Sequence, residues 1–133
     1  MAVFAAYFVK ETVLLVEDQM DVLRVMRRGL EALGYTVLAA KGGPEALALA
    51  ARHEGTIDLL VTDAVMPGMN GRDLALGLAA TRPDTMVLYV SGYPDQSVVH
   101  HGLLAPGLAF LQKPFAPDAL ARKIRDVLKT VTR

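Results

Sequence analysis

The chain has 133 residues, of which 53% are hydrophobic, so it is long enough for one domain with a substantial apolar core. Its 14 basic and 14 acidic residues balance, so no global charge favours nucleic acid or an anionic membrane surface, and we expect no direct binding to nucleic acid. The chain has no cysteine, which excludes disulfides, thiolate catalysis and zinc–thiolate sites and is compatible with a cytoplasmic location.

Residues 1–11 form an apolar leader, interpreted as a linker or a cloning scar. The opening "MAVFAAYFV" has nine apolar residues, too few to span a bilayer, and it has no basic start typical of a signal peptide. We therefore expect no membrane insertion and assign residues 12–133 to one domain.

Five short apolar runs follow in the chain, each typical of a strand buried on both faces of a parallel sheet. They span residues 12–17, 35–40, 57–62, 85–90 and 108–112. Between them, hydrophobic residues recur at helical spacing. This spacing predicts helices over 19–33, from Gly43 until Gly55, over 71–81, and from Pro117 onward.

Two details of these helices are specific expectations. In the first helix, the residues expected to face the core are Val22, Met26, Leu30 and Leu33. Prolines and glycines within 94–107 predict that the fourth helix is short or irregular. The strand–helix alternation predicts an α/β fold with a parallel sheet and helices on both faces.

Polar side chains follow four of the predicted strands: Glu17 and Asp18, then Asp63, Ser91 and Lys113. The carboxyl ends of parallel strands lie at one edge of the sheet, where ligands of such folds bind. A single aspartate at such a place is usually a turn or cap residue, but matched chemistry at successive strand ends favours a site.

The chemistry of this set is coherent. Carboxylates that gather together need a cation, and hard oxygen ligands suit Mg²⁺. A rigidly held aspartate can act as a nucleophile toward phosphorus, while a lysine and a serine hydroxyl hold the phosphoryl oxygens.

Four stretches resemble the receiver domain of response regulators in two-component signalling. They are "VLLVED" (13–18), "DLLVTDAVMPGMNG" (58–71), "VLYVSGY" (87–93) and "FLQKPF" (110–115). The resemblance implies a flavodoxin-like (βα)5 fold, doubly wound in three α/β/α layers with strand order 2-1-3-4-5.

The resemblance also implies residue roles. Asp63 is the expected phosphoacceptor. Mg²⁺, or Mn²⁺ as a substitute, is expected to bind Glu17, Asp18, Asp63 and the backbone carbonyl of Val65. The expected phosphoryl-binding groups are Ser91, Lys113 and the backbone of Ala64.

Further roles concern switching and lifetime. Ser91 and Phe110 are the expected switch residues, although Phe110 lacks the hydroxyl of the tyrosine that many members have, so its switching would depend on packing alone. The Lys113–Pro114 bond is expected to be cis. We hypothesise that the apolar residues Val65 and Tyr93, each two residues after a site residue, exclude water and prolong the phosphorylated state.

The predicted function is that of a phosphoacceptor domain in a two-component phosphorelay. Its expected partner is a histidine kinase or a histidine phosphotransfer protein, with a homodimer through the helix 4–strand 5–helix 5 face as a further expectation. The "ETVLLVED" start and "GLAFLQKPF" ending favour the receiver of a hybrid histidine kinase.

Two alternatives stay open. The first is a receiver-like scaffold that never takes phosphate, which would be expected to lack one of the acidic or lysine residues. The second is an Mg²⁺-dependent phosphohydrolase with an aspartate nucleophile. Such enzymes usually have a second aspartate two residues later, where this chain has Val65, so we expect no turnover of a separate substrate.

Overall fold

The computed structural model describes residues 11–92 and 108–129, which form one parallel sheet with helices on both faces. The strands are β1 (Thr12–Val16), β2 (Thr36–Ala40), β3 (Leu59–Asp63), β4 (Met86–Ser91) and β5 (Phe110–Gln112). The helices are α2 (Met20–Ala32), α3 (Gly43–Arg52), α4 (Gly71–Ala79) and α6 (Pro117–Lys129). The leader 1–10, the predicted fourth helix within 94–107 and the end of the chain lie outside the described residues.

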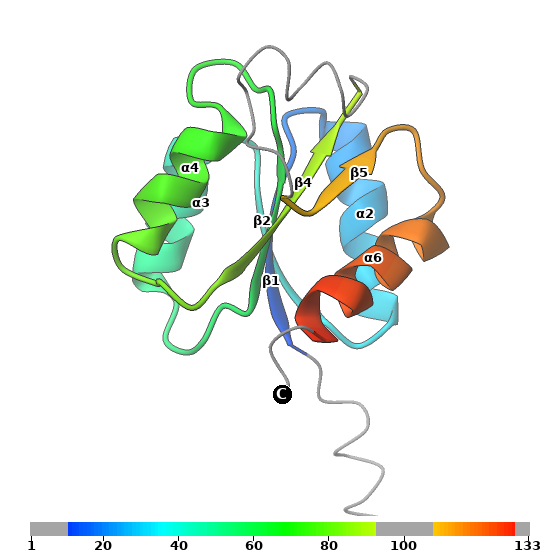
Figure 1. The fold of residues 1–133 in the computed structure, drawn as a ribbon, viewed down its shortest axis with the longest axis horizontal. Helices are drawn as coiled ribbons and strands as arrows, with labels where there is room; N and C mark the ends of the chain where they lie inside the picture. The colour runs from blue at the N-terminus through cyan, green and yellow to red at the C-terminus, as the bar shows by residue number, and fades with distance from the viewer. Residues whose placement is uncertain (1–10, 93–107, 130–133) are drawn as a thin grey trace, which may run out of the picture.

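The sheet has the order β2-β1-β3-β4-β5, and all pairs are parallel. Helices α3 and α4 cover one face, and α2 and α6 cover the other (Figure 1). The predicted flavodoxin-like order is therefore confirmed. This order makes β1 and β3 neighbours and places the end of β5 two strands away from the end of β3.

Each face of the sheet has its own apolar core. Alternate residues of β1 contribute to opposite cores: Val13 and Leu15 pack toward α2 and α6, whereas Leu14 and Val16 pack toward α3 and α4. All four are essentially inaccessible to solvent. The central strands are buried on both faces, which explains why they read as continuous apolar runs in the sequence.

The expected core stripe of the first helix was partly wrong. Leu23, Met26 and Leu30 are the buried residues of α2, whereas Leu33 is 45% exposed and Val22 is only partly buried. The spacing 23, 26, 30 follows one face of the helix that lies on the sheet. Leu33 follows the last helical residue and caps the helix through its backbone N–H, so it has left that face.

The strand boundaries differ from the predicted ones by one or two residues, most of all in the third and fifth strands. The third strand begins at Leu59 and includes Asp63, whose Cα pairs in register with Val90 of β4. The fifth strand is shorter than predicted, because Leu108 is 45% exposed and pairing with β4 begins at Phe110. Asp63 is thus the last residue of a buried strand and is held by its ladder on β4.

Candidate functional site

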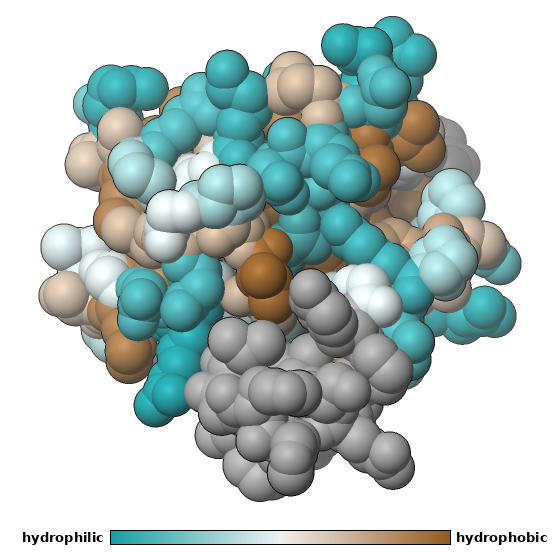
Figure 2. All heavy atoms as spheres, turned by 90° about the horizontal axis from the view of Figure 1, so that it is seen from above, coloured by the Kyte–Doolittle hydropathy of each residue, from teal (hydrophilic) through white to brown (hydrophobic). Residues whose placement is uncertain are grey.

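Three carboxylates meet at the carboxyl edge of the sheet. Glu17 and Asp18 follow β1, and Asp63 ends the neighbouring β3, where the register pairs Val16 with Thr62. One carboxylate oxygen from each lies within 4.8 Å of the other two. Glu17 is fully buried and Asp63 is 4% exposed, whereas Asp18 is exposed. Figure 2 looks onto this edge, where hydrophilic residues cover much of the described surface.

Lys113 supplies the cation of this cluster. Its Nζ atom lies 2.8 Å from Oδ1 of Asp63 and forms a second ion pair with Oε1 of Glu17. Its backbone N–H donates to the carbonyl of Ser91 at 2.7 Å, which fixes the end of β5 against the end of β4. From there the side chain crosses the end of β4 to reach both carboxylates, and only about a fifth of it is exposed.

Glu17 and Asp63 differ in their hydrogen bonding. Glu17 accepts from Lys113 at Oε1 and from the backbone N–H of Gln19 at Oε2, 3.0 Å away. By contrast, Oδ1 of Asp63 is buried, and within the described ranges no donor reaches it with hydrogen-bonding geometry, although Lys113 lies at ion-pair distance. Asp63 therefore keeps an oxygen that is short of a partner.

Burial is the main cause of the raised pKa of Asp63. The pKa of Asp63 is raised from 3.8 to about 7. Desolvation is the largest cause, the nearby ammonium of Lys113 acts against the rise, and the charge of Glu17 adds to it. Burial lowers the pKa of Lys113, but Asp63 and Glu17 outweigh it and leave the pKa of Lys113 raised. Lys113 is therefore cationic at neutral pH, while Asp63 exchanges its proton near neutrality.

The donor set fits a hard divalent cation. The buried Oδ1 of Asp63 lacks a well-directed donor among the described residues, and a carboxylate oxygen of the exposed Asp18 lies within 4.8 Å of one of Asp63. Both are oxygen ligands of the kind that Mg²⁺ prefers, and the exposure of Asp18 leaves room for water. Glu17 already accepts hydrogen bonds from two donors, Lys113 and the N–H of Gln19. Its contribution to a cation site therefore includes holding Lys113 in place.

The loop after β3 holds two further predicted residues. Val65 is 41% exposed, and its predicted role as a carbonyl ligand of the metal stays a prediction. Ala64 is buried, and its N–H donates to the carbonyl of Val90 at 2.8 Å. That N–H is thus directed at β4 in this structure, and its role toward a phosphoryl group stays a prediction.

The remaining predicted residues lie on β4 and β5. Ser91 ends β4 and is 3% exposed, next to Gln112 in the register. Phe110 begins β5 and is partly buried, and the Lys113–Pro114 peptide bond is cis. Tyr93 lies outside the described residues.

Gly71 is a site residue that the sequence analysis missed. Its N–H donates to the carbonyl of Ala64 at 3.0 Å, and a Cβ at this position would overlap the carbonyl oxygen of Asp63. Only glycine lets the start of α4 lie directly on the end of β3. The sequence feature that could have indicated it is the pair "NG" (70–71) at the start of the helix. The side chain of Asn70 caps this helix by accepting a hydrogen bond from the N–H of Asp73.

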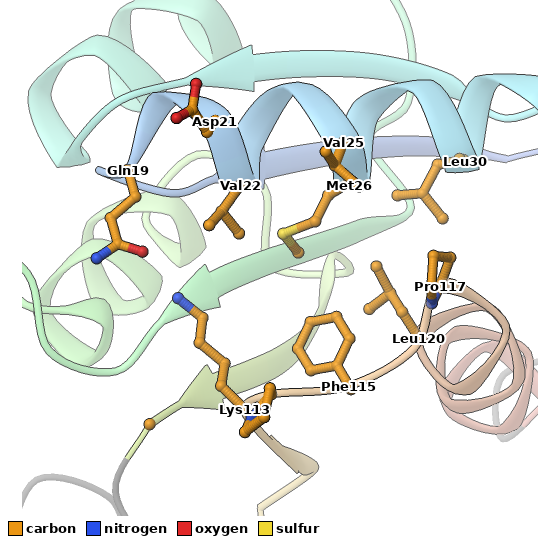
Figure 3. Close-up of a pocket in the computed structure, with 13 residues that line it drawn as sticks. Gln19, Asp21, Val22, Val25, Met26, Leu30, Lys113, Phe115, Pro117 and Leu120 are labelled. Atoms are coloured by element: carbon orange, nitrogen blue, oxygen red, sulfur yellow. The ribbon is translucent and has the colours of Figure 1, made fainter.

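A groove runs from the site along α2. Its volume is about 610 Å³, and its walls are mainly apolar side chains of α2 and of the segment from Lys113 to the first turn of α6. In Figure 3, Phe115 and Leu120 face Val22 and Met26 across it, and the Lys113 side chain extends past its end toward the start of α2. The groove therefore opens next to the carboxylate cluster.

Residues 13–125 match the family model for the response regulator receiver domain. The chain belongs to this family. Receiver domains are regulatory modules that interact with histidine kinases or phosphotransfer proteins, and their acidic cluster binds Mg²⁺. This membership agrees with the geometry, because the carboxylates, serine and lysine of the family motifs lie at one edge of the sheet.

Relatives occur in several kinds of protein. The chain is 38% identical over 118 residues to the sensor kinase CckA of Brucella abortus, covering 89% of this chain and 12% of that protein. It is 35% identical over 117 residues to the response regulator MprA of Mycobacterium leprae, covering 88% of this chain and 50% of that protein. The chain therefore spans half or less of these relatives' length.

Solved structures agree with the fold. The receiver domain from the hybrid histidine kinase CckA superposes with a TM-score of 0.74 at 37% identity, covering 88% of this chain and 98% of that chain. A receiver domain protein from Clostridium thermocellum superposes with a TM-score of 0.78 at 23% identity, covering 92% of this chain and 98% of that chain, which supports the fold alone. Within the described part, every helix is too short or too polar to cross a membrane.

Proposed function

We propose that Asp63 accepts a phosphoryl group and that Lys113, Ser91 and an Mg²⁺ ion held by Asp18 and Asp63 support the transfer. The observation that carries this proposal is the buried Asp63 carboxylate, whose Oδ1 has the Lys113 ammonium 2.8 Å away as an ion-pair partner and no well-directed hydrogen bond among the described residues. An Asp63 oxygen attacks phosphorus, the bond from phosphorus to the donor breaks, and the donor leaves with the electron pair of that bond. Bound Mg²⁺, or Mn²⁺ in its place, would neutralise charge on the phosphoryl oxygens.

The chain's own residues prepare this step. Burial of Asp63 in the β3 ladder fixes the nucleophile, and Glu17 fixes the lysine through its ion pair. Lys113 is cationic, so it can follow a new anionic group on Asp63. Movement of Ser91 and Phe110 toward that group would reshape the β4–β5 side of the domain, which is the regulatory output.

Intact mass spectrometry after incubation with acetyl phosphate and Mg²⁺ tests this proposal. We expect one added phosphoryl group, which is lost in Asp63→Asn and without metal but kept in Asp118→Asn, a change at an exposed aspartate of α6. No adduct despite measurable Mg²⁺ binding would favour the scaffold alternative. Steady phosphate release over many turnovers would favour the phosphohydrolase alternative.

The phosphoryl lifetime is a separate proposal. Val65 is 41% exposed at the edge of the site, and we propose that Val65 and Tyr93 keep water from the phosphorylated aspartate. Val65→Asn and Tyr93→Glu should then speed dephosphorylation, measured as loss of the adduct with time. An unchanged rate in both variants would contradict this idea.

The apolar groove is the surface that we propose for the phosphodonor protein, because it opens beside Lys113 and includes exposed apolar residues such as Val25. Val25→Asp should slow transfer from a phosphorylated histidine phosphotransfer protein but leave labelling by acetyl phosphate unchanged. Equal loss with both donors would show that the substitution acts on the site and not on docking.

The context is proposed from the relatives. We propose that the chain works in the cytoplasm as the receiver of a larger signalling protein, and the similarity to receivers of hybrid histidine kinases supports this. A kinase core encoded in the same reading frame would support it. The homodimer through the helix 4–strand 5–helix 5 face is tested by light scattering with and without phosphorylation.

A further inference from the structure

Tyr89 lies between the proposed phosphoacceptor and the proposed switch residue. It is a residue of β4, is 4% exposed, and is the direct cross-strand partner of Phe110 on β5. With Ala64, the residue after Asp63, it forms a small buried cluster of its own. Phe110 and Ala75 of α4 pack against this cluster.

The pleat of β4 places Tyr89 on the same face as Ser91. Side chains alternate along a strand, so Tyr89 and Ser91, two residues apart, share one face. Their neighbours Leu88 and Val90 belong to the core beneath α2 and α6 on the other face. Tyr89 therefore lies under the site on the side of the sheet where Phe110 packs.

The charge of Arg72, at the start of α4, acts on Tyr89. Burial raises the pKa of Tyr89, and the positive charge of Arg72 lowers it, which places Arg72 within electrostatic reach of the hydroxyl. Arg72 follows Gly71, whose N–H binds the carbonyl of Ala64. The end of β3, the start of α4 and the Tyr89 ring are thus one contiguous unit.

An apolar residue would fill this position equally well if packing were all that it required. A buried tyrosine keeps a polar group that costs free energy unless it interacts. Phe110, on the neighbouring strand, lacks the hydroxyl. The cluster therefore still contains one aromatic hydroxyl, but it is on β4 instead of β5.

We infer that Tyr89 is a positioning residue of the switch: its ring forms the surface on which Phe110 packs, and it brings to this cluster the aromatic hydroxyl that Phe110 lacks. This inference rests on the proposed function. Phosphorylation that moves Ser91 and Phe110 would then change the surroundings of Tyr89 and, through Arg72, the start of α4.

Fluorine NMR of the chain labelled with fluorotyrosine tests this inference. The chain has four tyrosines, and Tyr→Phe variants assign their resonances. Beryllofluoride with Mg²⁺ serves as the phosphoryl probe. Tyr35 is the matched control, because it is 7% exposed and belongs to the core on the opposite face of the sheet.

The expected result is a shift of the Tyr89 resonance on adding beryllofluoride, with the Tyr35 resonance unchanged. Phe110→Leu and Arg72→Gln should each reduce the Tyr89 shift, whereas Arg122→Gln, at an exposed arginine of α6, should not. If the probe binds and raises the melting temperature but the Tyr89 resonance shifts no more than that of Tyr35, Tyr89 is an ordinary core residue and the inference fails.

The failure of the proposed function gives a different result. In that case beryllofluoride does not raise the melting temperature and does not shift any tyrosine resonance, and acetyl phosphate gives no adduct at Asp63. That result would overturn the inference as well, because the switch would have no signal to follow.

Discussion

The Nζ atom of Lys113 lies 2.8 Å from Oδ1 of Asp63, and this ion pair joins the ends of two strands that are not neighbours in the sheet. Lys113 also pairs with the fully buried Glu17. One ammonium thus attracts both carboxylates and offsets part of their mutual repulsion in a low-dielectric environment.

Removal of this ammonium should destabilise the protein. At pH 8, Lys113→Met leaves two buried carboxylates without their cation, and we expect the free energy of unfolding to fall by about 2–3 kcal/mol. Urea denaturation measures the change, and Lys41→Met, at an exposed lysine, is the control. Mg²⁺ should stabilise Lys113→Met more than the unmodified chain, because the ion replaces the lost charge. Equal stabilisation of both would argue against a shared electrostatic cluster.

Binding of Mg²⁺ should depend on pH through Asp63. The cation binds the ionised carboxylate, and the pKa of Asp63 is about 7. Between pH 6 and pH 8 the ionised fraction rises about tenfold, so the affinity should rise by about the same factor. Calorimetric titration at both pH values measures this rise. An affinity that is flat over this range would mean that Asp63 is ionised throughout or is not a ligand.

The charge of Asp63 should also lower stability at alkaline pH when no metal is bound. The folded state keeps the proton up to about pH 7, whereas the unfolded chain loses it near 3.8. The folded state therefore binds more protons in this window, and stability falls as pH rises through it. Asp63→Asn removes this effect.

We expect Asp63→Asn to raise the free energy of unfolding at pH 8, by at most about 4 kcal/mol for a shift of this size. The gain should shrink toward pH 4, where the aspartate is protonated in the folded state. Thermal melts across this range, without metal, provide the measurement, and Asp118→Asn should show no such trend. A gain that is independent of pH would point to packing rather than charge.

Two glycines of α4 should respond in opposite directions to alanine. In Gly71→Ala the new Cβ overlaps the carbonyl oxygen of Asp63, so the helix start must move away, with a loss of about 1–3 kcal/mol. In Gly77→Ala the new Cβ makes ordinary contacts with Leu47 at 3.5 Å, so higher helix propensity should add up to about 1 kcal/mol.

Urea denaturation of both variants gives the stability comparison, and the rate of labelling by acetyl phosphate reports on the site. We expect Gly71→Ala to label more slowly and Gly77→Ala to label at the rate of the unmodified chain. If both variants behaved alike, the contact between the start of α4 and the end of β3 would not be the cause.

The sequence by itself determined the α/β fold and the residues at the edge of the sheet. Continuous apolar runs are required wherever a strand is buried on both faces, and the polar residues that end them are therefore conspicuous. Glu17, Asp63 and Lys113 could be predicted in this way, because parallel strands have their carboxyl ends at one edge of the sheet. The pattern could not place the helix faces with the same accuracy, and Leu33 was assigned to the core although it caps the helix.

Only the tertiary structure decided which side chains are in contact. Lys113 pairs with Glu17 as well as Asp63 because the side chain crosses the end of β4, a path that depends on distances between strands distant in sequence. The need for glycine at position 71 follows from the close approach of α4 to β3. Tyr89 reads as one more apolar strand residue, and its place beside Phe110 follows from the register of β4 and β5. Local patterns encode burial and periodicity, whereas such contacts depend on how separate segments pack together.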